Sequence, residues 1–230
     1  MPQQTLILGY GTTGKSYVNY LLSLGKRIKI FDTRTLDVPD DVMKNKRIQF
    51  FQKKVPKDIL DNINQVLVSP GFDPRHPLIK KIRDESIELL TDIDIFKKNI
   101  SSKIISVTGT NGKTTVVSMI EHILNDLNRK CIACGNNGIP PLTINNENYE
   151  FIILELSSYQ LEYMKNFDSF ISLLINISPD HLERHGNFEK YFQIKKKIFN
   201  DAEICIINMQ LKDNLHTKNA LYYGYNSVKN

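Results

Sequence analysis

The sequence has few cysteines, no long apolar run and no clear targeting signal. It contains three cysteines in 230 residues, an odd number that argues against a disulfide framework. Its longest apolar stretches, such as residues 170–177, are interrupted and much shorter than the roughly 18–20 residues of a membrane-spanning helix. The start, Met1-Pro2-Gln3-Gln4, lacks the basic and then apolar layout of a signal peptide. We therefore expect a soluble, cytoplasmic protein that does not act at a membrane.

The chain also lacks a concentrated charge of one sign. Thirty Lys and Arg residues against 25 Asp and Glu residues give a net charge of +5, which is too small and too dispersed to predict a nucleic-acid partner. Hydrophobic residues make up 41% and charged residues 24%. These values are close to the globular average, so a disordered or fibrous chain is excluded.

Strand-like and helix-like segments alternate along the whole chain, which predicts an α/β fold with parallel sheets. Several strand-like runs are apolar on consecutive positions, as expected for strands buried on both faces. The alternation begins twice, each time at a glycine-rich turn, at Gly9–Gly14 and again at Gly109–Lys113. The polar, Lys-rich segment Asp92–Ser102 between them is interpreted as a linker. We therefore predict one domain over residues 1–97 and a second over residues 98–230.

The first glycine-rich turn, Gly9-Tyr10-Gly11-Thr12-Thr13-Gly14-Lys15-Ser16, satisfies two phosphate-binding patterns. As G-x-G-x-x-G, with Asp32 closing the next strand, it is typical of a dinucleotide site whose acidic residue reads the ribose. As G-x-x-x-x-G-K-S it fits an ATP-binding P-loop, with Lys15 and Ser16 in the working positions. The position of Asp32 favours the dinucleotide-like fold. An alternative is that the glycines bind no phosphate and only allow the strand and the helix to pack closely.

The second glycine-rich turn is the better candidate for ATP, although Val107 stands where the P-loop pattern has its first glycine. A strand-like run ends in a compact Gly/Asn loop, and Lys113 with two threonines then opens a helix. In this arrangement the Lys113 ammonium meets the β- and γ-phosphates and the Thr114 hydroxyl binds Mg²⁺. The residues expected to surround ATP are Gly109, Thr110, Asn111, Gly112, Lys113, Thr114 and Thr115.

Four stretches, taken in order, resemble the motifs of the Mur ligases, which build the peptide stem of peptidoglycan. They are Thr108–Thr115, Gly135-Asn136-Asn137-Gly138, Leu154–Glu162 and Asp180–Gly186. The third stretch contains the motif Glu-Leu-Ser-Ser-Tyr-Gln-Leu-Glu, which resembles the corresponding motif in the branch of the family that adds D-glutamate. The resemblance implies a Rossmann-like N-terminal domain followed by a P-loop-type α/β ATPase domain that is incomplete here, with the family's C-terminal domain absent.

The resemblance also implies an activity and a set of catalytic residues. Members of this branch use ATP to convert the carboxylate of UDP-N-acetylmuramoyl-L-alanine into an acyl phosphate, which the amine of D-glutamate then attacks. By the same resemblance Lys113, Glu155, His181 and Lys195 are catalytic. Thr114 and Glu155 would hold the nucleotide Mg²⁺, and His181 a second Mg²⁺. Lys195 would react with CO₂ to give a carbamate that supports that second ion.

For the UDP-sugar substrate, the resemblance implies that the first glycine-rich turn holds UDP rather than NAD or ATP. The Lys15-Ser16 match is then accidental, and Asp32 is not a ribose reader for NAD. The implied substrate-binding residues are Gly11, Thr12, Thr13, Asp32, Thr33, Arg34, Ser69, Pro70 and Gly71 in the first domain, and Asn136, Ser157 and Gln160 in the second.

The residues that read D-glutamate in the family have no counterpart in this sequence. We therefore expect an N-terminal portion of a ligase that does not turn over alone. Three alternatives remain. One is a Mur ligase that adds another amino acid, and another is a non-catalytic module that binds a UDP-sugar. The third is an NAD-dependent oxidoreductase, which leaves Gly109–Thr115 unexplained.

Overall fold

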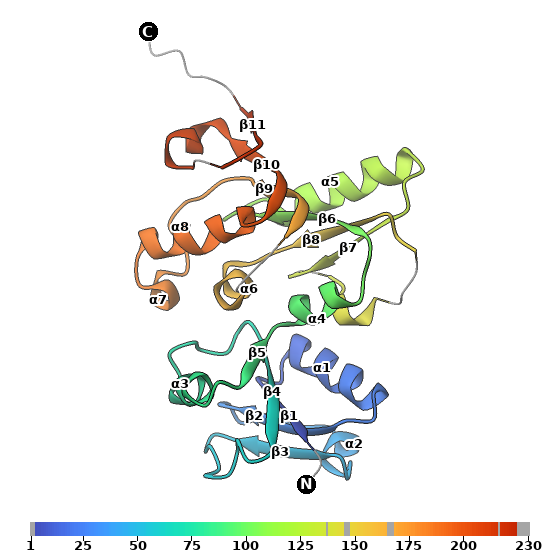
Figure 1. Cartoon of the computed structure of the whole chain (residues 1–230), viewed down its shortest axis with the longest axis vertical. Coiled ribbons are helices and arrows are strands. Elements are labelled where there is room, and N and C mark those ends of the chain that lie inside the picture. The colour runs from blue at the N-terminus through green and yellow to red at the C-terminus, as the bar shows by residue number, and fades with distance from the viewer. Residues whose placement is uncertain (1–2, 137, 145–147, 165–167, 216, 225–230) are drawn as a thin grey trace. The chain divides into compact units, whose positions relative to one another are not determined.

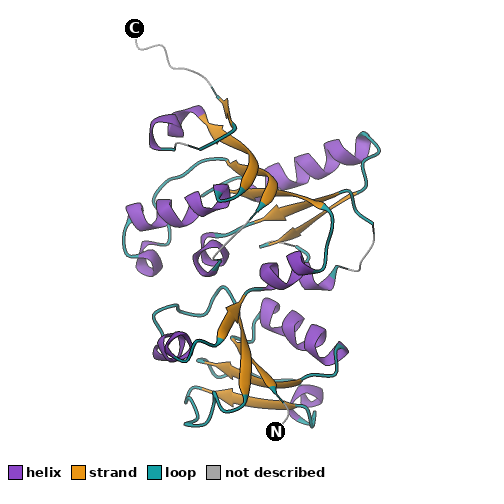
Figure 2. Ribbon diagram, in the orientation of Figure 1, coloured by secondary structure: helices purple, strands orange, loops and turns teal. Residues whose placement is uncertain are grey.

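The computed structural model describes residues 3–136, 138–144, 148–164, 168–215 and 217–224. The chain forms two compact units, one of residues 1–99 with 140–145 and one of residues 100–139 with 146–230. Both units are built on parallel sheets flanked by helices, which confirms the predicted α/β class (Figures 1 and 2). Among the described residues, no helix is long and apolar enough to span a bilayer.

The first unit holds a five-stranded parallel sheet in the order β3-β2-β1-β4-β5. Because the order runs outward from β1 in both directions, right-handed crossovers place α1 and α3 on opposite faces of the sheet. Its strands are β1 (Gln4–Leu8), β2 (Arg27–Asp32), β3 (Ile48–Gln52), β4 (Ile63–Val68) and β5 (Glu88–Leu90). Its helices are α1 (Thr12–Ser23), α2 (Asp40–Met43), α3 (Pro77–Asp84), α4 (Asp92–Lys98) and the 3₁₀ helix η1 (Pro141–Thr143).

The second unit holds a six-stranded parallel sheet in the order β11-β10-β9-β6-β8-β7. Its strands are β6 (Lys103–Thr108), β7 (Cys131–Gly135), β8 (Phe151–Glu155), β9 (Ser169–Leu174), β10 (Ala202–Asn208) and β11 (Ala220–Tyr223). Its α-helices are α5 (Lys113–Asp126), α6 (Ser158–Tyr163), α7 (Leu182–His185) and α8 (Phe188–Lys196). Two short 3₁₀ helices, η2 (Lys197–Phe199) and η3 (Met209–Asn214), flank β10.

The segment interpreted as a linker, Asp92–Ser102, is largely helical, and the boundary between the two units falls within it, after Asn99. Helix α4 occupies Asp92–Lys98, and its first turn is closed by a capping box. The Thr91 hydroxyl accepts the backbone N–H of Asp94, and the Asp94 carboxylate accepts the backbone N–H of Thr91. Ile93, Ile95 and Phe96 are buried, so the apolar residues of this polar-looking segment face the core of the first unit.

Close packing at the first glycine-rich turn depends on Gly14. A Cβ atom at that position would lie 2.1 Å from the carbonyl oxygen of Gly9, on the backbone itself. Only glycine allows α1 to pack this closely on the end of β1. The interpretation that the glycines serve packing is therefore correct for Gly14, whereas a Cβ on Gly11 would meet nothing within 4 Å.

Asp92 carries a carboxylate deep in the first unit. The residue is 2% exposed, and its Oδ1 atom accepts the backbone N–H of Ile93 at 3.1 Å. Burial raises the pKa of Asp92 to about 6, above the roughly 3.9 of an unfolded chain. Between these two values the native state binds more protons than the unfolded state, so stability falls as the pH rises through this window.

We therefore expect Asp92→Asn to increase the free energy of unfolding at pH 7.5, by up to about 3 kcal/mol, and to leave it nearly unchanged at pH 4. Urea unfolding followed by circular dichroism at the two pH values measures this difference. Asp84→Asn, on an exposed carboxylate of α3, is the matched control and should change neither value. An equal effect of Asp92→Asn at both pH values would contradict the role of ionisation.

Candidate functional site

The loop between β6 and α5 lies at the carboxyl edge of the second sheet, where ligands of parallel α/β folds bind. Gly112 precedes the helix with a left-handed backbone (φ 79°), a conformation that favours glycine. The Lys113 ammonium folds back over the loop and donates to the carbonyls of Gly109 at 3.0 Å and Thr110 at 2.9 Å. The loop thus places a cation and a helix N-terminus together, as phosphate binding requires.

Asn176, just after β9, holds this loop in place. Its Oδ1 atom accepts the backbone N–H groups of Thr110 and Asn111 at 3.1 and 3.0 Å, and its Nδ2 atom donates to the Asn111 carbonyl at 3.0 Å. The strand next to β6 therefore fixes the loop through one side chain. Sequence reasoning missed Asn176, although its position directly after an apolar strand was a usable signal.

Glu155 ends β8 beside this loop and is 2% exposed. Its Oε2 atom accepts the Thr114 hydroxyl at 2.9 Å, and its Oε1 atom accepts the Asn136 amide at 2.9 Å. A hydroxyl and a carboxylate are hard oxygen donors, which are the ligands that Mg²⁺ prefers. The structure therefore brings Thr114 and Glu155 together at the loop, and their chemistry fits a magnesium ion.

Lys195 reaches the same loop from α8 and is 1% exposed. Its ammonium donates to the Thr108 hydroxyl at 3.0 Å and to the Gly109 carbonyl at 2.9 Å. The Gly109 carbonyl oxygen thus receives two lysine ammonium groups, those of Lys113 and Lys195. Burial, followed by the charge of Lys113, lowers the pKa of Lys195 to about 7, against a smaller opposing effect of Asp180.

The neighbouring lysines of α8 and η2 do not reach the loop in this way. Lys196 is half-buried, and Lys197 donates to the carbonyls of Leu161, Glu162 and Met164 at 3.2–3.3 Å. Lys197 therefore satisfies carbonyls at the carboxyl end of α6. Of the three consecutive lysines, Lys195 is the one that contacts the phosphate-type loop.

His181 lies at the start of α7 with a left-handed backbone (φ 51°), and its side chain is 47% exposed. Its ring packs against Tyr159, with 5.0 Å between ring centroids. Within the part of the chain that the structure describes, no group of three or more His, Cys, Asp and Glu side chains could hold a metal.

A polar and aromatic cluster that sequence reasoning missed surrounds His181. The Arg184 guanidinium lies 4.2 Å from the centroid of the Tyr159 ring and donates to Glu162 at 2.8 Å. The buried His185 places its Nε2 atom 3.0 Å from the Ser158 hydroxyl and its Nδ1 atom 3.6 Å from Glu162. These contacts fix the short helix α7 on α6 and thereby set the position of His181.

In the first unit, Lys15 and Ser16 have surroundings that differ from those of Lys113 and Thr114. Lys15 is exposed. Ser16 is 4% exposed, and its hydroxyl donates to the Thr13 carbonyl at 2.7 Å, so it is engaged within its own helix. This geometry agrees with the interpretation that the P-loop match at Gly9–Ser16 is accidental.

The Asp32 carboxylate braces the glycine-rich turn of the first unit. It accepts the backbone N–H of Tyr10 at 2.7 Å and three N–H groups of Arg34, from the backbone and the guanidinium, at 2.9–3.0 Å. Burial acts to raise the pKa of Asp32, but the hydrogen bonds from Arg34 and Tyr10 outweigh it and lower that pKa. Both oxygens are thus occupied within the protein, which disfavours a role in reading a ribose.

The remaining predicted substrate residues are distributed over two places. Ser69 closes the turn of the first unit by donating its hydroxyl to the Gly9 carbonyl at 2.9 Å. Of the other predicted substrate residues in the first unit, Thr12 and Thr13 begin α1, Thr33 and Arg34 follow β2, and Pro70 and Gly71 follow Ser69.

The predicted substrate residues of the second unit lie on two elements. Ser157 and Gln160 form the capping box of α6. Asn136 contacts Glu155, and Asn137 of the same motif lies outside the described residues.

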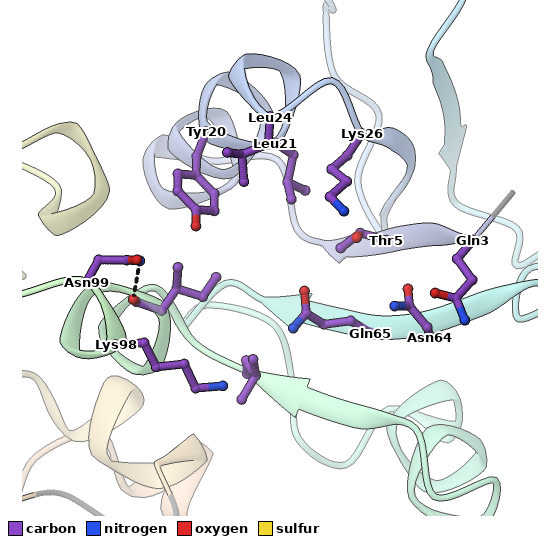
Figure 3. A pocket seen from close by; sticks show the side chains of 12 residues that line it. Gln3, Thr5, Tyr20, Leu21, Leu24, Lys26, Asn64, Gln65, Lys98 and Asn99 are labelled. Carbon is purple, nitrogen blue, oxygen red and sulfur yellow. Dashed lines mark hydrogen bonds between the residues drawn. The ribbon is translucent and has the colours of Figure 1, made fainter.

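Figure 3 shows a pocket of about 250 Å³ in the first unit, lined by residues that include Tyr20, Lys26, Gln65 and Lys98. It lies beside the first residues of β1 and β4, at the amino edge of the sheet, whereas the glycine-rich turn follows the carboxyl end of β1. The pocket therefore contains none of the predicted substrate residues.

The comparisons with known proteins agree with this geometry. The family model described as Mur ligase middle domain matches residues 107–229, and that described as Mur ligase MurD-like, N-terminal domain, matches residues 3–91. Proteins from Buchnera aphidicola (Acyrthosiphon pisum, strain Tuc7) and Syntrophus aciditrophicus are each named UDP-N-acetylmuramoylalanine--D-glutamate ligase. The chain is 36% identical to the first over 228 residues and 31% identical to the second over 220 residues.

These matches cover 97% and 92% of the chain but only 51% and 49% of the two relatives, so the chain spans about half their length. Among solved structures, a UDP-N-acetylmuramate:L-alanyl-gamma-D-glutamyl-meso-diaminopimelate ligase from Neisseria meningitides matches with a TM-score of 0.61 and 14% identity, over 98% of this chain and 79% of that chain. At that identity the likeness concerns the fold alone. The middle-domain match extends over more than half of the residues, and the chain belongs to the Mur ligase family.

Proposed function

We propose that this chain is the UDP-sugar- and ATP-binding part of a ligase that adds D-glutamate to UDP-N-acetylmuramoyl-L-alanine during peptidoglycan precursor synthesis. The arrangement of Lys113, Thr114, Glu155 and Lys195 around one loop supports this proposal most strongly. Retention of these four groups also disfavours a non-catalytic UDP-sugar module. Recognition of D-glutamate is assigned to the half of the relatives that this chain does not match.

The first chemical step joins two anions, because the substrate carboxylate attacks the γ-phosphorus of ATP. An oxygen–phosphorus bond forms, the bond to ADP breaks, and an acyl phosphate results. Lys113 would place its positive charge where the phosphate oxygens gather, which offsets the repulsion. To do so its ammonium must leave the carbonyls of Gly109 and Thr110 for the phosphates. The amine of D-glutamate then attacks the acyl carbon, loses a proton, and phosphate departs.

Two metal positions are part of the proposal. Thr114 and Glu155 would hold a Mg²⁺ ion, which supplies charge neutralisation at the phosphates when it is bound. His181 and a carbamate on Lys195 would hold a second. A carbamate forms when a neutral amine attacks CO₂ and loses a proton. The lowered pKa of Lys195, about 7, keeps much of that amine uncharged at neutral pH.

The predicted N-terminal domain, residues 1–97, is proposed to hold UDP, through Gly11 to Thr13 at the diphosphate, Asp32, Thr33 and Arg34 near the uridine, and Ser69 to Gly71 beside it. Asn136, Ser157 and Gln160 are proposed to contact the muramoyl-alanyl end. The hydrogen bonds of Asp32 to Tyr10 and Arg34 support a structural bracing role for this carboxylate in that site.

Calorimetric titration of the chain with UDP-N-acetylmuramoyl-L-alanine should give saturable binding, and titration with NAD should give none. Asp32→Ala should weaken the UDP-sugar at least about tenfold, because the turn at Tyr10 and the Arg34 side chain both lose their acceptor. Asp37→Ala, at an exposed position of the same segment, should leave the affinity unchanged. Saturable binding of NAD in place of the UDP-sugar would refute this assignment of the first unit.

Binding of MgATP should depend on only one of the two Gly-Lys pairs. We expect Lys113→Ala to weaken MgATP binding by roughly 10- to 100-fold, since it removes the cation at the phosphates, and Lys15→Ala to have no effect. Fluorescence titration with a labelled ATP analogue in the presence of Mg²⁺ measures both constants. If Lys15→Ala weakens MgATP binding and Lys113→Ala does not, the ATP site lies in the first unit.

The carbamate on Lys195 should be visible directly. Incubation with ¹³C-labelled bicarbonate should give one carbamate carbon resonance, which increases between pH 6 and pH 8 as the amine loses its proton. Lys195→Arg should abolish the resonance and Lys196→Arg should retain it. If the resonance survives Lys195→Arg, the carbamate belongs to another amine.

A further inference from the structure

The pocket shown in Figure 3 lies at the amino edge of the first sheet, beside the last turns of α1 and α4. Residues paired in register on adjacent strands point to the same face. On the face that packs with α1, one row across β1, β4 and β5 is apolar and consists of Ile7, Leu67 and Leu90. The next row toward the amino edge is polar and consists of Thr5, Gln65 and Glu88. The sheet face under α1 therefore changes from apolar to polar at the pocket.

Thr5 is the buried member of the polar row. The residue is 5% exposed and lines the pocket. Within the part of the chain that the structure describes, its hydroxyl has no hydrogen-bond partner. Buried polar side chains are nearly always hydrogen-bonded, so such a group indicates a partner from outside the chain. The Thr5 hydroxyl is therefore available to a molecule bound in the pocket.

The charge around the pocket is positive. Lys26, directly before β2, lines the pocket and has no ion-pair partner among the described residues. Lys98 lies with its ammonium 3.6 Å from the Glu88 carboxylate, which also accepts the Gln65 amide at 3.3 Å. Two ammonium groups against one carboxylate leave one positive charge uncompensated. The pocket is therefore suited to a single negative charge, and Glu88 disfavours a dianion.

Part of the pocket wall is apolar. Leu21 of α1 and Ile95 of α4 line the pocket and are buried. Leu24, which follows α1, also lines it and is 53% exposed. A molecule that covers Leu24 removes apolar surface from water, which favours binding. The pocket thus combines an apolar wall with a few polar groups, as small-molecule sites do.

The size and lining of the pocket exclude other classes of ligand. Its volume of about 250 Å³ equals that of about eight water molecules at about 30 Å³ each, and it lies below the roughly 300–1,000 Å³ of sites for drug-sized ligands. A nucleotide is therefore too large. None of the residues that line the pocket is Asp or Glu, so it lacks the carboxylates that a divalent cation requires.

We propose that this pocket binds a small monocarboxylate with an apolar body, of roughly eight to ten non-hydrogen atoms in all. The carboxylate accepts from the Thr5 hydroxyl and the Lys26 ammonium, which Figure 3 shows directed toward Thr5. The apolar body lies against Leu21 and Ile95. This inference does not rest on the proposed function, because the pocket shares no residue with the proposed UDP and ATP sites.

The test is NMR titration of the ¹⁵N-labelled 230-residue chain with benzoate, which has this size and both chemical parts. We expect saturable shifts with a Kd of about 1 mM or below, in the amides of residues 21–26, 64–65 and 95–99 and not in those of the loop at 109–115. Lys26→Gln should weaken benzoate at least about tenfold, because a charge-assisted hydrogen bond is lost. Thr5→Val, which keeps the side-chain shape, should weaken it roughly threefold or more.

Arg27→Gln is the matched control, since Arg27 is the adjacent exposed cation and does not line the pocket. It should leave the affinity for benzoate unchanged. Benzamide, which has the same shape without the charge, should bind at least about tenfold more weakly, and inorganic phosphate, which has no apolar body, should not saturate.

Four outcomes would overturn the proposal. They are the absence of saturable shifts with benzoate, shifts that map outside the pocket, equal weakening by Lys26→Gln and Arg27→Gln, and equal binding of benzoate with either benzamide or phosphate. The shifts should persist in the presence of UDP-N-acetylmuramoyl-L-alanine, because the pocket and the glycine-rich turn lie at opposite edges of the sheet. Displacement of benzoate by the UDP-sugar would place benzoate in the substrate site and would also refute a separate pocket site.

Discussion

Two lysine ammonium groups converge on one carbonyl oxygen, that of Gly109, and the second unit is organised around this convergence of positive charge. Two like charges so close are unfavourable, and burial makes them more so because water no longer screens them. Burial of the Lys195 ammonium, and after it the charge of Lys113, lowers the pKa of Lys195 to about 7. An anion bound at the loop would also offset the repulsion between the two lysines. The loop therefore concentrates positive charge beside a buried lysine whose pKa is lowered.

The parallel sheet explains how residues distant in sequence reach this point. Strands β6, β8 and β9 are hydrogen-bonded neighbours, so their carboxyl ends lie side by side and deliver the glycine loop, Glu155 and Asn176 to one edge. Helix α8 then returns Lys195 to the same edge. The buried apolar side chains of these strands stabilise the sheet. Their packing therefore fixes the positions of the polar groups at its carboxyl edge.

Much of this was predictable from the sequence, and the remainder depends on contacts that a sequence does not display. The strand–helix alternation and the two glycine loops are local patterns, and they predicted the α/β class and a strand–loop–helix turn at Gly109–Lys113. The helix at Asp92–Lys98 was missed because its polar residues suggested a linker, whereas Thr91 and Asp94 form a capping box and Ile93 and Phe96 are buried. The packing of Tyr159 and Arg184 around His181 could not be predicted, because it joins two short helices through side-chain orientation alone.

The two Gly-Lys-Ser/Thr loops have similar sequences but different surroundings in the structure. The first loop matches the ATP pattern fully, yet the Ser16 hydroxyl is engaged by the Thr13 carbonyl and Lys15 is exposed. The second departs from the pattern at Val107, yet the Thr114 hydroxyl contacts the buried Glu155 carboxylate. What differs is the residue at the end of a neighbouring strand, more than 40 positions away. The surroundings of each loop therefore depend on the neighbouring strands of its sheet as well as on its own residues, and the proposed Mg²⁺ site rests on this difference.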